Sequence, residues 1–373
     1  MKKFRKLPWL SVLIVVSNAM ALGSAGAESV LDKLSLPDGF HIQYFAENVP
    51  NARSMTLGDD GTVYVGTGRE GKVYAVLDKD RDGKSDSVVT LLSGLNMPNG
   101  VAFREGALYI AEISRIIRIN KVAEHLNGRV KPEVIYDWYP TDVHHGWKHI
   151  RFGPDGKLYV PVGAPCNICK PKKEVYATIT RMNPEGGDFE IFARGIRNTV
   201  GFDWHPVTQS LWFTENGRDR LGEEVPPEEL NHAPKAGLEF GYPYCHAGDI
   251  PDPEFGQQAS CDEFVPPSWK FPAHVAPLGI RFYTGDQFPG EYRNQLFVAQ
   301  HGSWNRKNPL GYRVVLVKFK GAKPVSDINF AEGWLQPNGK VLGRPVDILQ
   351  MPDGAILVSD DQRGVIYRIF YRK

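Results

Sequence analysis

The chain has 373 residues with 44 basic and 43 acidic side chains, so its formal net charge at pH 7 is only +1. This balance gives no basic excess of the kind that holds nucleic acid or an anionic membrane surface, and we expect neither partner. The 38 glycines, the 28 prolines and the lack of a long stretch with 3.6-residue periodicity favour β-structure with many turns.

The first 27 residues have the pattern of a secretory signal peptide. A basic start is followed by the apolar run Leu10–Val16, and Ala25-Gly26-Ala27 forms a small-residue cleavage site before Glu28. A membrane anchor is the alternative, but this run is too short to span a bilayer comfortably. We therefore predict a leader over residues 1–27, export to a bacterial periplasm, and no membrane span after cleavage. Because four basic residues and no acidic one leave with the leader, the mature chain keeps 40 basic and 43 acidic residues.

A strand–turn–strand pattern recurs along the mature chain. Its clearest copy is Ile150–Val160, where an apolar strand, a Gly-Pro-Asp-Gly turn and an alternating strand follow one another. Six copies at the spacing of propeller blades predict an all-β fold, a six-bladed β-propeller forming one domain over residues 28–373. Phe40–Phe45 is expected to add a strand to the last blade and close the ring. An open sandwich is the alternative that the repeat count disfavours. The copies span residues 55–76, 101–119, 150–182, 202–213, 280–319 and 347–369.

Two acidic stretches are candidates for metal binding. In the first, carboxylates alternate around Gly83 as in the first half of a calcium loop, although Val89 stands where an EF-hand has its glutamate. We expect a structural calcium ion there, with a solvated Asp-Gly turn as the alternative. The second stretch, Thr214–Asn231, would place either solvated glutamates or the carbonyls of its Asn-Gly turn near a channel end. The candidate ligands of the first stretch are Asp78, Asp80, Asp82, Lys84 and Asp86.

All four cysteines lie in the mature chain, where an oxidising compartment permits disulfides. Cys245 and Cys261 bracket a loop rich in proline, glycine and aspartate, and are candidates for a pair. Cys166 and Cys169 form a Cys-x-x-Cys motif. Lys170 follows it instead of histidine, which argues against covalent haem, and no two further zinc ligands are evident nearby. We therefore expect structural disulfides.

Polar residues stand at corresponding positions, four or five residues before the first strand, in several copies. Corresponding loops of a propeller meet at one end of its central channel, so we expect these side chains to line one cavity. The set supplies a base, two cationic groups and two amides. Its members are His145, Arg197, Asn198, Arg344 and Asn96.

With these residues, the chain resembles the glucose/sorbosone dehydrogenase family, whose members use pyrroloquinoline quinone (PQQ). The likeness extends from about Leu36 to Arg372. It is carried by His-Gly-x-x-x-Ile-x-Phe-Gly-Pro-Asp-Gly from His145, Gly-Ile-Arg-Asn from Gly195, and Thr-Glu-Asn-Gly-Arg-Asp from Thr214. Further shared motifs are Glu229-Leu230-Asn231, Phe240-Gly241-Tyr242-Pro243 and Gly343-Arg344-Pro345, while His301–Arg306 looks like the sorbosone-type branch.

The resemblance implies roles for individual residues. His145 matches the catalytic base, Arg197 and Asn198 the residues that face the quinone, and Arg344 a carboxylate-binding arginine. Gly217 and Arg218 match positions whose carbonyls hold the calcium ion bound to PQQ. His301, Arg306 and Asn96 are further candidate cofactor contacts. The chain departs from the glucose enzymes at His144, which replaces an aspartate, at His301-Gly302-Ser303, which lacks their lysine, and at Val346, which replaces an arginine.

The chemistry of PQQ suits these residue types. Its three carboxylates need cationic side chains and a calcium ion, and a neutral imidazole can take a hydroxyl proton while hydride leaves carbon for the quinone. We therefore predict a dehydrogenase of an aldose or a sugar aldehyde that passes electrons to a periplasmic or membrane acceptor. One alternative is a calcium-dependent propeller lactonase, with carboxylate ligands on the axis. The other is a non-catalytic secreted propeller that binds a partner.

Overall fold

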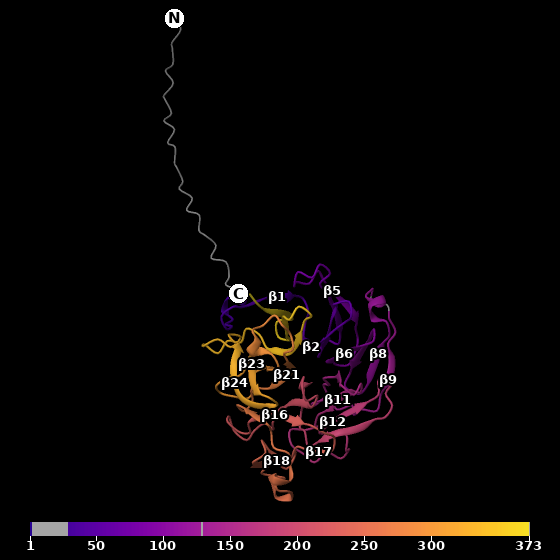
Figure 1. Cartoon of the computed structure of the whole chain (residues 1–373), viewed down its shortest axis with the longest axis vertical. Coiled ribbons are helices and arrows are strands. Elements are labelled where there is room, and N and C mark those ends of the chain that lie inside the picture. Colours follow the sequence, from indigo (N-terminus) through magenta and orange to yellow (C-terminus); the bar gives the residue numbers. More distant parts are fainter. Residues whose placement is uncertain (2–28, 128–129, 373) are drawn as a thin grey trace.

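The computed structural model describes residues 1, 29–127 and 130–372. Apart from Met1, the predicted leader over residues 1–27 lies outside this part of the chain and stays a prediction. Six sheets follow one another round a ring, five of them with four strands and one with five (Figure 1). The predicted all-β, six-bladed propeller is confirmed. No helix among the described residues is long and apolar enough to cross a membrane.

The blades are antiparallel and take the strands in chain order. The first contains β2 (Ala52–Leu57), β3 (Val63–Thr67), β4 (Val73–Leu77) and β5 (Ser87–Leu92). The second contains β6 (Gly100–Arg104), β7 (Ala107–Ala111), β8 (Ile116–Ile119) and β9 (Glu133–Tyr136). The third contains β10 (Arg151–Phe152), β11 (Leu158–Val162), β12 (Thr178–Met182) and β13 (Glu190–Arg194), with β17 (Leu238–Glu239) parallel to β13.

The remaining blades follow the same rule. The fourth contains β14 (Phe202–Trp204), β15 (Leu211–Glu215), β16 (Glu228–Ala233) and β20 (Trp269–Phe271). The fifth contains β21 (Pro277–Phe282), β22 (Leu296–Gln300), β23 (Arg313–Lys320) and β24 (Lys323–Ala331). The sixth contains β25 (Pro345–Gln350), β26 (Ile356–Asp360), β27 (Val365–Tyr371) and β1 (Phe40–Ala46). A small hairpin, β18 (Cys245–His246) and β19 (Ile250–Pro251), stands apart from the blades.

The ring closes where the first strand joins the last blade. β1 runs antiparallel to β27, with Phe40 opposite Tyr371 and Ala46 opposite Ile366. In Figure 1, β1 lies beside the C-terminal end of the chain. The predicted closing strand is therefore confirmed. Closure removes the exposed sheet face that a terminal blade would otherwise present to water.

The core lies between neighbouring blades. Alternate strand residues point to opposite faces of a sheet, so each blade contributes apolar side chains to two interfaces. Between the first and last blades, Met55, Val63 and Val65 pack with Leu357 and Ile366, all of them buried. Each such aliphatic side chain contributes about 1.5–3 kcal/mol when it is fully buried. These interfaces fix the blades and hence the loops at the channel end.

Around the channel, the first strands of neighbouring blades contact one another: β2 contacts β6 and β25, β21 contacts β14 and β25, and β6 contacts β10. Loops that enter these strands therefore meet at one end. In the second acidic stretch Glu224 is exposed, as the solvated alternative expects, whereas Glu228 and Glu229 are not. Glu228 and Glu229 belong to β16 and are buried, because β16 is an inner strand of its sheet, with Glu229 paired opposite Glu215 on β15 and Lys270 on β20.

Candidate active site

A cavity of about 740 Å³ opens where the loops before the inner strands meet. This one cavity is lined by the predicted base and by most of the predicted cofactor residues. Their shared loop position in the blades explains why they meet there. The exposed side chains of Val143 and Trp304 also contribute to its wall. The predicted residues that it brings together are His145, Arg197, Asn198, Arg344, His301 and Gly217.

His145 is held in an unusual backbone conformation on the loop that enters β10. Its φ is +49°, in the left-handed region that non-glycine residues rarely adopt. Gly163 makes room for it, since a Cβ atom at Gly163 would lie 2.5 Å from the His145 Cβ atom. The imidazole Nδ1 lies 2.9 Å from the carbonyl oxygen of Ala164. A carbonyl only accepts, so Nδ1 carries the proton and Nε2 keeps its lone pair.

The surroundings of His145 keep its ring neutral. Burial, followed by the charge of Arg197 and the neighbouring His144 ring, lowers the pKa of His145 from 6.5 to about 2. The two histidine rings lie 4.0 Å apart, centroid to centroid. His144, which stands where the glucose enzymes have an aspartate, also has a pKa lowered by burial and by Arg197. His145 is therefore a proton acceptor at neutral pH.

Four hydrogen bonds hold the guanidinium group of Arg197. It donates to the carbonyl oxygens of Asn167 and Asn216 at 2.8 and 2.9 Å, to Asn167 Oδ1 at 2.8 Å and to Asp219 Oδ2 at 3.3 Å. The residue is only 3% exposed. Its main-chain amide donates to the buried carboxyl of Glu215. Arg197 is thus a fixed positive charge in the cavity wall.

A second group of charges surrounds Asp361, which follows β26 in the blade that closes the ring. Asp361 receives Arg53 Nη1 at 2.7 Å on one oxygen and lies 2.9 Å from His301 Nε2 on the other. Burial favours a protonated Asp361, but His301, Arg53 and Arg344 lower its pKa below the ordinary range. Arg344 donates to the carbonyls of His301 and Gly302 at 3.0 and 2.6 Å. Arg53 also stacks on Trp147, with its Cζ atom 4.3 Å from the ring centroid.

Oxygen atoms gather on the wall formed by Gly217, Asp219 and Glu228. Glu228 Oε2 accepts the Gly217 amide at 2.6 Å, and burial raises the pKa of this carboxyl to about 8. Asp219 Oδ1 accepts the Asn305 side-chain amide at 2.7 Å. Carboxylate and carbonyl oxygens are the ligands that calcium prefers.

Three predicted site residues do not line the cavity. The main chain of Asn96 is tied to Glu112 and Ile113, and the next residue, Met97, lines the cavity instead. The side chain of Arg306 pairs with Glu224 and donates to the carbonyls of Glu223 and Ala273, so its neighbour Asn305 reaches the cavity. The Arg218 side chain pairs with Asp252 and Glu254. For Asn96 and Arg306 a closer partner holds the residue away, whereas the predicted role of Arg218 belongs to its main-chain carbonyl, which the side-chain pairs do not involve.

Several cavity residues were not identified from the sequence. Arg53 and Arg69 add two cations, and Val346 packs with Val200 and Leu278 into an apolar patch that contributes to the wall. Arg53 lies on β2 rather than in a loop before it, so an alignment of loop positions misses it. The other additions are Trp147, Asp219, Glu228, His274 and Asn305; of these, Asp219 lies in the motif from Thr214 and Asn305 in the stretch His301–Arg306.

The first acidic stretch forms a compact loop beside β1. Asp78, Asp80 and Asp86 each offer a carboxylate oxygen, and these atoms lie within 4.8 Å of one another. Asp78 Oδ1 is buried without a hydrogen-bond partner. Asp82 and Lys84 are not in this group, and the Asp82 carboxylate accepts the Lys84 main-chain amide at 2.7 Å. Within the described residues no other group of three acidic, histidine or cysteine side chains has such spacing.

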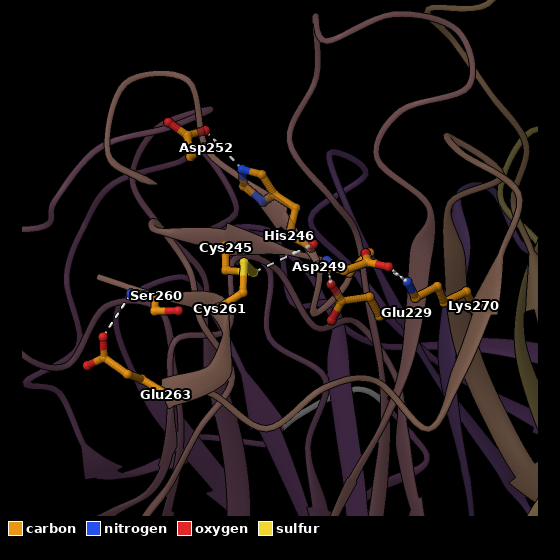
Figure 2. The surroundings of a disulfide bond; sticks show 10 residues. Glu229, Cys245, His246, Asp249, Asp252, Ser260, Cys261, Glu263 and Lys270 are labelled. Carbon is orange, nitrogen blue, oxygen red and sulfur yellow. Dashed lines mark hydrogen bonds and ion pairs between the residues drawn. A yellow bond between two sulfur atoms is a disulfide. The ribbon is translucent and has the colours of Figure 1, made fainter. Parts of the chain in front are cut away.

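Both expected disulfides are present, Cys166–Cys169 and Cys245–Cys261. Figure 2 shows the second one, with His246 pointing toward Asp252, whose carboxylate lies 2.9 Å from His246 Nε2. The same carboxylate receives Arg218. The loop closed by this disulfide therefore anchors Arg218 next to Gly217.

Comparisons with known proteins agree with this geometry. The family model described as TrAA12-like matches residues 34–372. An uncharacterized protein of Borreliella burgdorferi is 34% identical over 365 residues, 93% of each chain. A pyrroloquinoline quinone-dependent sugar dehydrogenase of Hypocrea jecorina is 32% identical over 142 residues, which cover 29% of this chain and 31% of that protein. The holo form of the pyranose dehydrogenase PQQ domain from Coprinopsis cinerea has the same fold, with a TM-score of 0.77 and 19% identity over 90% of this chain and 97% of that one. The resemblance to PQQ-dependent sugar dehydrogenases is confirmed, and the chain belongs to the TrAA12-like family.

Proposed function

We propose that the chain is a PQQ- and calcium-dependent dehydrogenase that oxidises an aldose or a sugar aldehyde, with His145 as the base. The observation that carries this proposal is a neutral imidazole with a free Nε2 beside a fixed arginine, in a cavity that four arginines line. Similarity to proteins named as PQQ-dependent sugar dehydrogenases supports it.

The charges at the cavity fit a cofactor with three carboxylates. Arg53, Arg69, Arg197 and Arg344 line it, against two acidic side chains, Asp219 and Glu228. The raised pKa of Glu228 leaves this carboxyl largely protonated at neutral pH, so the cavity is positive overall. Arginine forms paired hydrogen bonds with carboxylates, which suits anchoring of a planar polycarboxylate. His301, held by Asp361, also lines the cavity, in the region that lacks the lysine of the glucose enzymes.

The wall of Gly217, Asp219 and Glu228 fits a calcium ion. It offers a main-chain carbonyl and two carboxylates, the hard oxygen ligands that calcium takes. A calcium ion bound there would stabilise the ionised form of Glu228 and lower its pKa from the value that burial sets. We infer that the carbonyls of Gly217 and Arg218 and the Glu228 carboxylate hold this ion.

When bound, PQQ supplies the two-electron acceptor that takes the hydride of the substrate carbon. His145 Nε2 accepts the proton of the hydroxyl on that carbon, while Ala164 keeps the proton on Nδ1 and so orients the ring. The imidazolium that forms is stabilised by negative charge brought into the cavity, because an anion raises the pKa of a neighbouring histidine. A periplasmic or membrane acceptor would take up the electrons.

The two alternatives fit the cavity less well. A calcium-dependent lactonase needs a cluster of carboxylate ligands on the axis. In the described residues, the cluster of candidate metal ligands lies at Asp78–Asp86, outside the cavity. A non-catalytic binding propeller gives no reason for a backbone-strained histidine with an oriented lone pair.

We also propose that the loop Asp78–Asp86 holds a structural calcium ion. Three converging carboxylates and the unpartnered Asp78 Oδ1 support this site. The loop is bonded to the closing strand, since Ser85 donates its amide to the Phe45 carbonyl and Gln43 donates its side chain to the Gly83 carbonyl. An ion here would therefore strengthen the closure of the ring.

The predicted leader and the two disulfides support a periplasmic location, because disulfides persist in oxidising compartments. The exposed Trp304 at the cavity offers a contact for a sugar ring or an electron acceptor.

The variant His145→Ala tests the role of the base. We expect its turnover in PQQ-loaded protein to fall by about 10²–10⁴-fold, while its affinity for PQQ changes little. His125→Ala, outside the cavity, is the matched control and should keep full turnover. Retained turnover in His145→Ala would rule out this role.

A further inference from the structure

The loop closed by the Cys166–Cys169 disulfide touches the cavity wall at several points. Its central residue, Asn167, makes four hydrogen bonds to two residues that line the cavity. The Asn167 carbonyl accepts Arg197 Nε at 2.8 Å, and Oδ1 accepts both Arg197 Nη2 at 2.8 Å and the Asp219 amide at 2.9 Å. Asn167 Nδ2 donates to the Asp219 carbonyl at 3.1 Å. One side chain therefore fixes a cation and an anion of the site together.

The disulfide loop is itself held in place from the other side. The Tyr242 hydroxyl accepts the Cys169 amide at 3.1 Å and lies 3.3 Å from Cys166 Sγ. His144, which lines the cavity, is hydrogen-bonded to the Cys166 main chain. The loop thus bridges Tyr242 and three cavity residues, His144, Arg197 and Asp219.

Packing alone does not explain the order of this loop. Its four residues, 166–169, are only half-buried, and of these Cys166 and Ile168 pack against a small apolar cluster of Ala164, Ala177 and Tyr242. Holding such a segment in one conformation costs conformational entropy, which a cross-link between its ends reduces. The disulfide adds that restraint to the packing against this small cluster.

We propose that Asn167, held by the Cys166–Cys169 disulfide, is a positioning residue that presets Arg197 and Asp219 for the cofactor. Asn167 acts through the Arg197 side chain and the Asp219 main chain and does not itself line the cavity. An arginine side chain that is fixed before binding loses less conformational entropy when it binds a carboxylate. Such preorganisation therefore increases the affinity for the cofactor. This inference rests on the proposed function for its effect on PQQ, but not for its effect on Asp219.

The first test measures PQQ affinity by absorption titration of the mature protein at fixed calcium excess. We expect Asn167→Ala and the double variant Cys166→Ser/Cys169→Ser each to weaken PQQ binding about tenfold. A change of this size corresponds to the loss of one or two hydrogen bonds to charged groups. The control Asn183→Ala, in a turn of the third blade, should stay within about twofold of wild type. In an Arg197→Ala background, Asn167→Ala should have almost no further effect, because the two residues act as one unit.

The second test follows hydrogen exchange of the segment around Asp219 and needs no cofactor. Because the Asp219 amide donates to Asn167 Oδ1, its exchange should be about tenfold faster in Asn167→Ala and in the Cys166/Cys169 double variant than in wild type. If the double variant fails to fold, Asn167→Ala alone decides.

The outcomes separate the two proposals. Wild-type protein that shows no saturable PQQ binding refutes the proposed function, and faster exchange at Asp219 would still support the positioning role. Wild type that binds, with Asn167→Ala binding equally well and exchanging at the same rate, overturns the positioning role alone. Additive effects of Asn167→Ala and Arg197→Ala would also overturn it.

Discussion

Substitution of Gly163 by alanine would place a methyl group against the proposed base. The added Cβ atom would lie 2.5 Å from His145 Cβ and 2.8 Å from the His145 carbonyl oxygen. Carbon atoms in contact prefer separations of about 3.5–4.0 Å, so His145 must move by roughly 1 Å. Overpacking of this kind costs about 1–3 kcal/mol of unfolding free energy. A displacement of about 1 Å at a reacting group reduces turnover by roughly 10²-fold.

The assay compares urea unfolding, PQQ affinity and sugar-dependent dye reduction for Gly163→Ala and wild type. Gly187→Ala is the matched control, because a Cβ atom at Gly187 would meet nothing within 4 Å. We expect Gly163→Ala to lose turnover well beyond its loss of stability, with the control unchanged. Wild-type turnover in a folded Gly163→Ala protein would refute the claim that His145 must occupy this position.

Two further predictions concern stability. Asp361→Asn leaves Arg53 and His301 without their carboxylate and should cost about 3–5 kcal/mol of unfolding free energy. The folded-state pKa of Asp361 lies below its ordinary 3.8. The difference in unfolding free energy between variant and wild type should therefore be full above pH 3.8 and should shrink as the pH falls through the lowered pKa. A difference that grows on acidification would contradict this expectation. Calcium at about 100 times its Kd should stabilise the protein by about 2.7 kcal/mol. Asp78→Asn should lose most of that stabilisation, whereas the control Asp38→Asn should keep it. Urea unfolding with and without chelator measures both variants.

The sequence predicted the blades well because strand alternation and turn residues are local signals. The strand that closes the ring was also predictable, since Phe40–Phe45 alternates and no other copy remained unpaired. The convergence of His145, Arg197, Asn198 and Arg344 followed from the equivalence of loops in a ring.

Individual loop positions were less predictable. Met97 has a φ of +50°, and this turn brings Met97 rather than Asn96 to the cavity. The periodicity of the strands does not reveal which residue of a loop adopts such a left-handed conformation. Arg306 is drawn away by Glu224, a partner that is 82 residues distant in the chain. Tertiary partners of this kind leave no local pattern.

The buried glutamates illustrate the same limit. Glu228 and Glu229 occur in an acidic stretch that suggests a solvated loop, yet both lie in β16 and are buried. Charged residues in an inner strand contradict ordinary β-propensity. Their place is explained by specific partners, the Gly217 amide for Glu228 and the Asn231 side chain and Ala247 amide for Glu229. Residues whose type disagrees with the β-propensity of their strand are expected at functional sites.

The central claim is most directly tested by titrating the purified mature protein with PQQ in the presence of calcium, followed by addition of aldoses. We expect saturable binding that requires calcium, and bleaching of the bound cofactor's absorption when a sugar is added. Absence of binding at calcium excess would contradict the account, because the four cavity arginines and the Gly217–Glu228 wall would then not form a cofactor site.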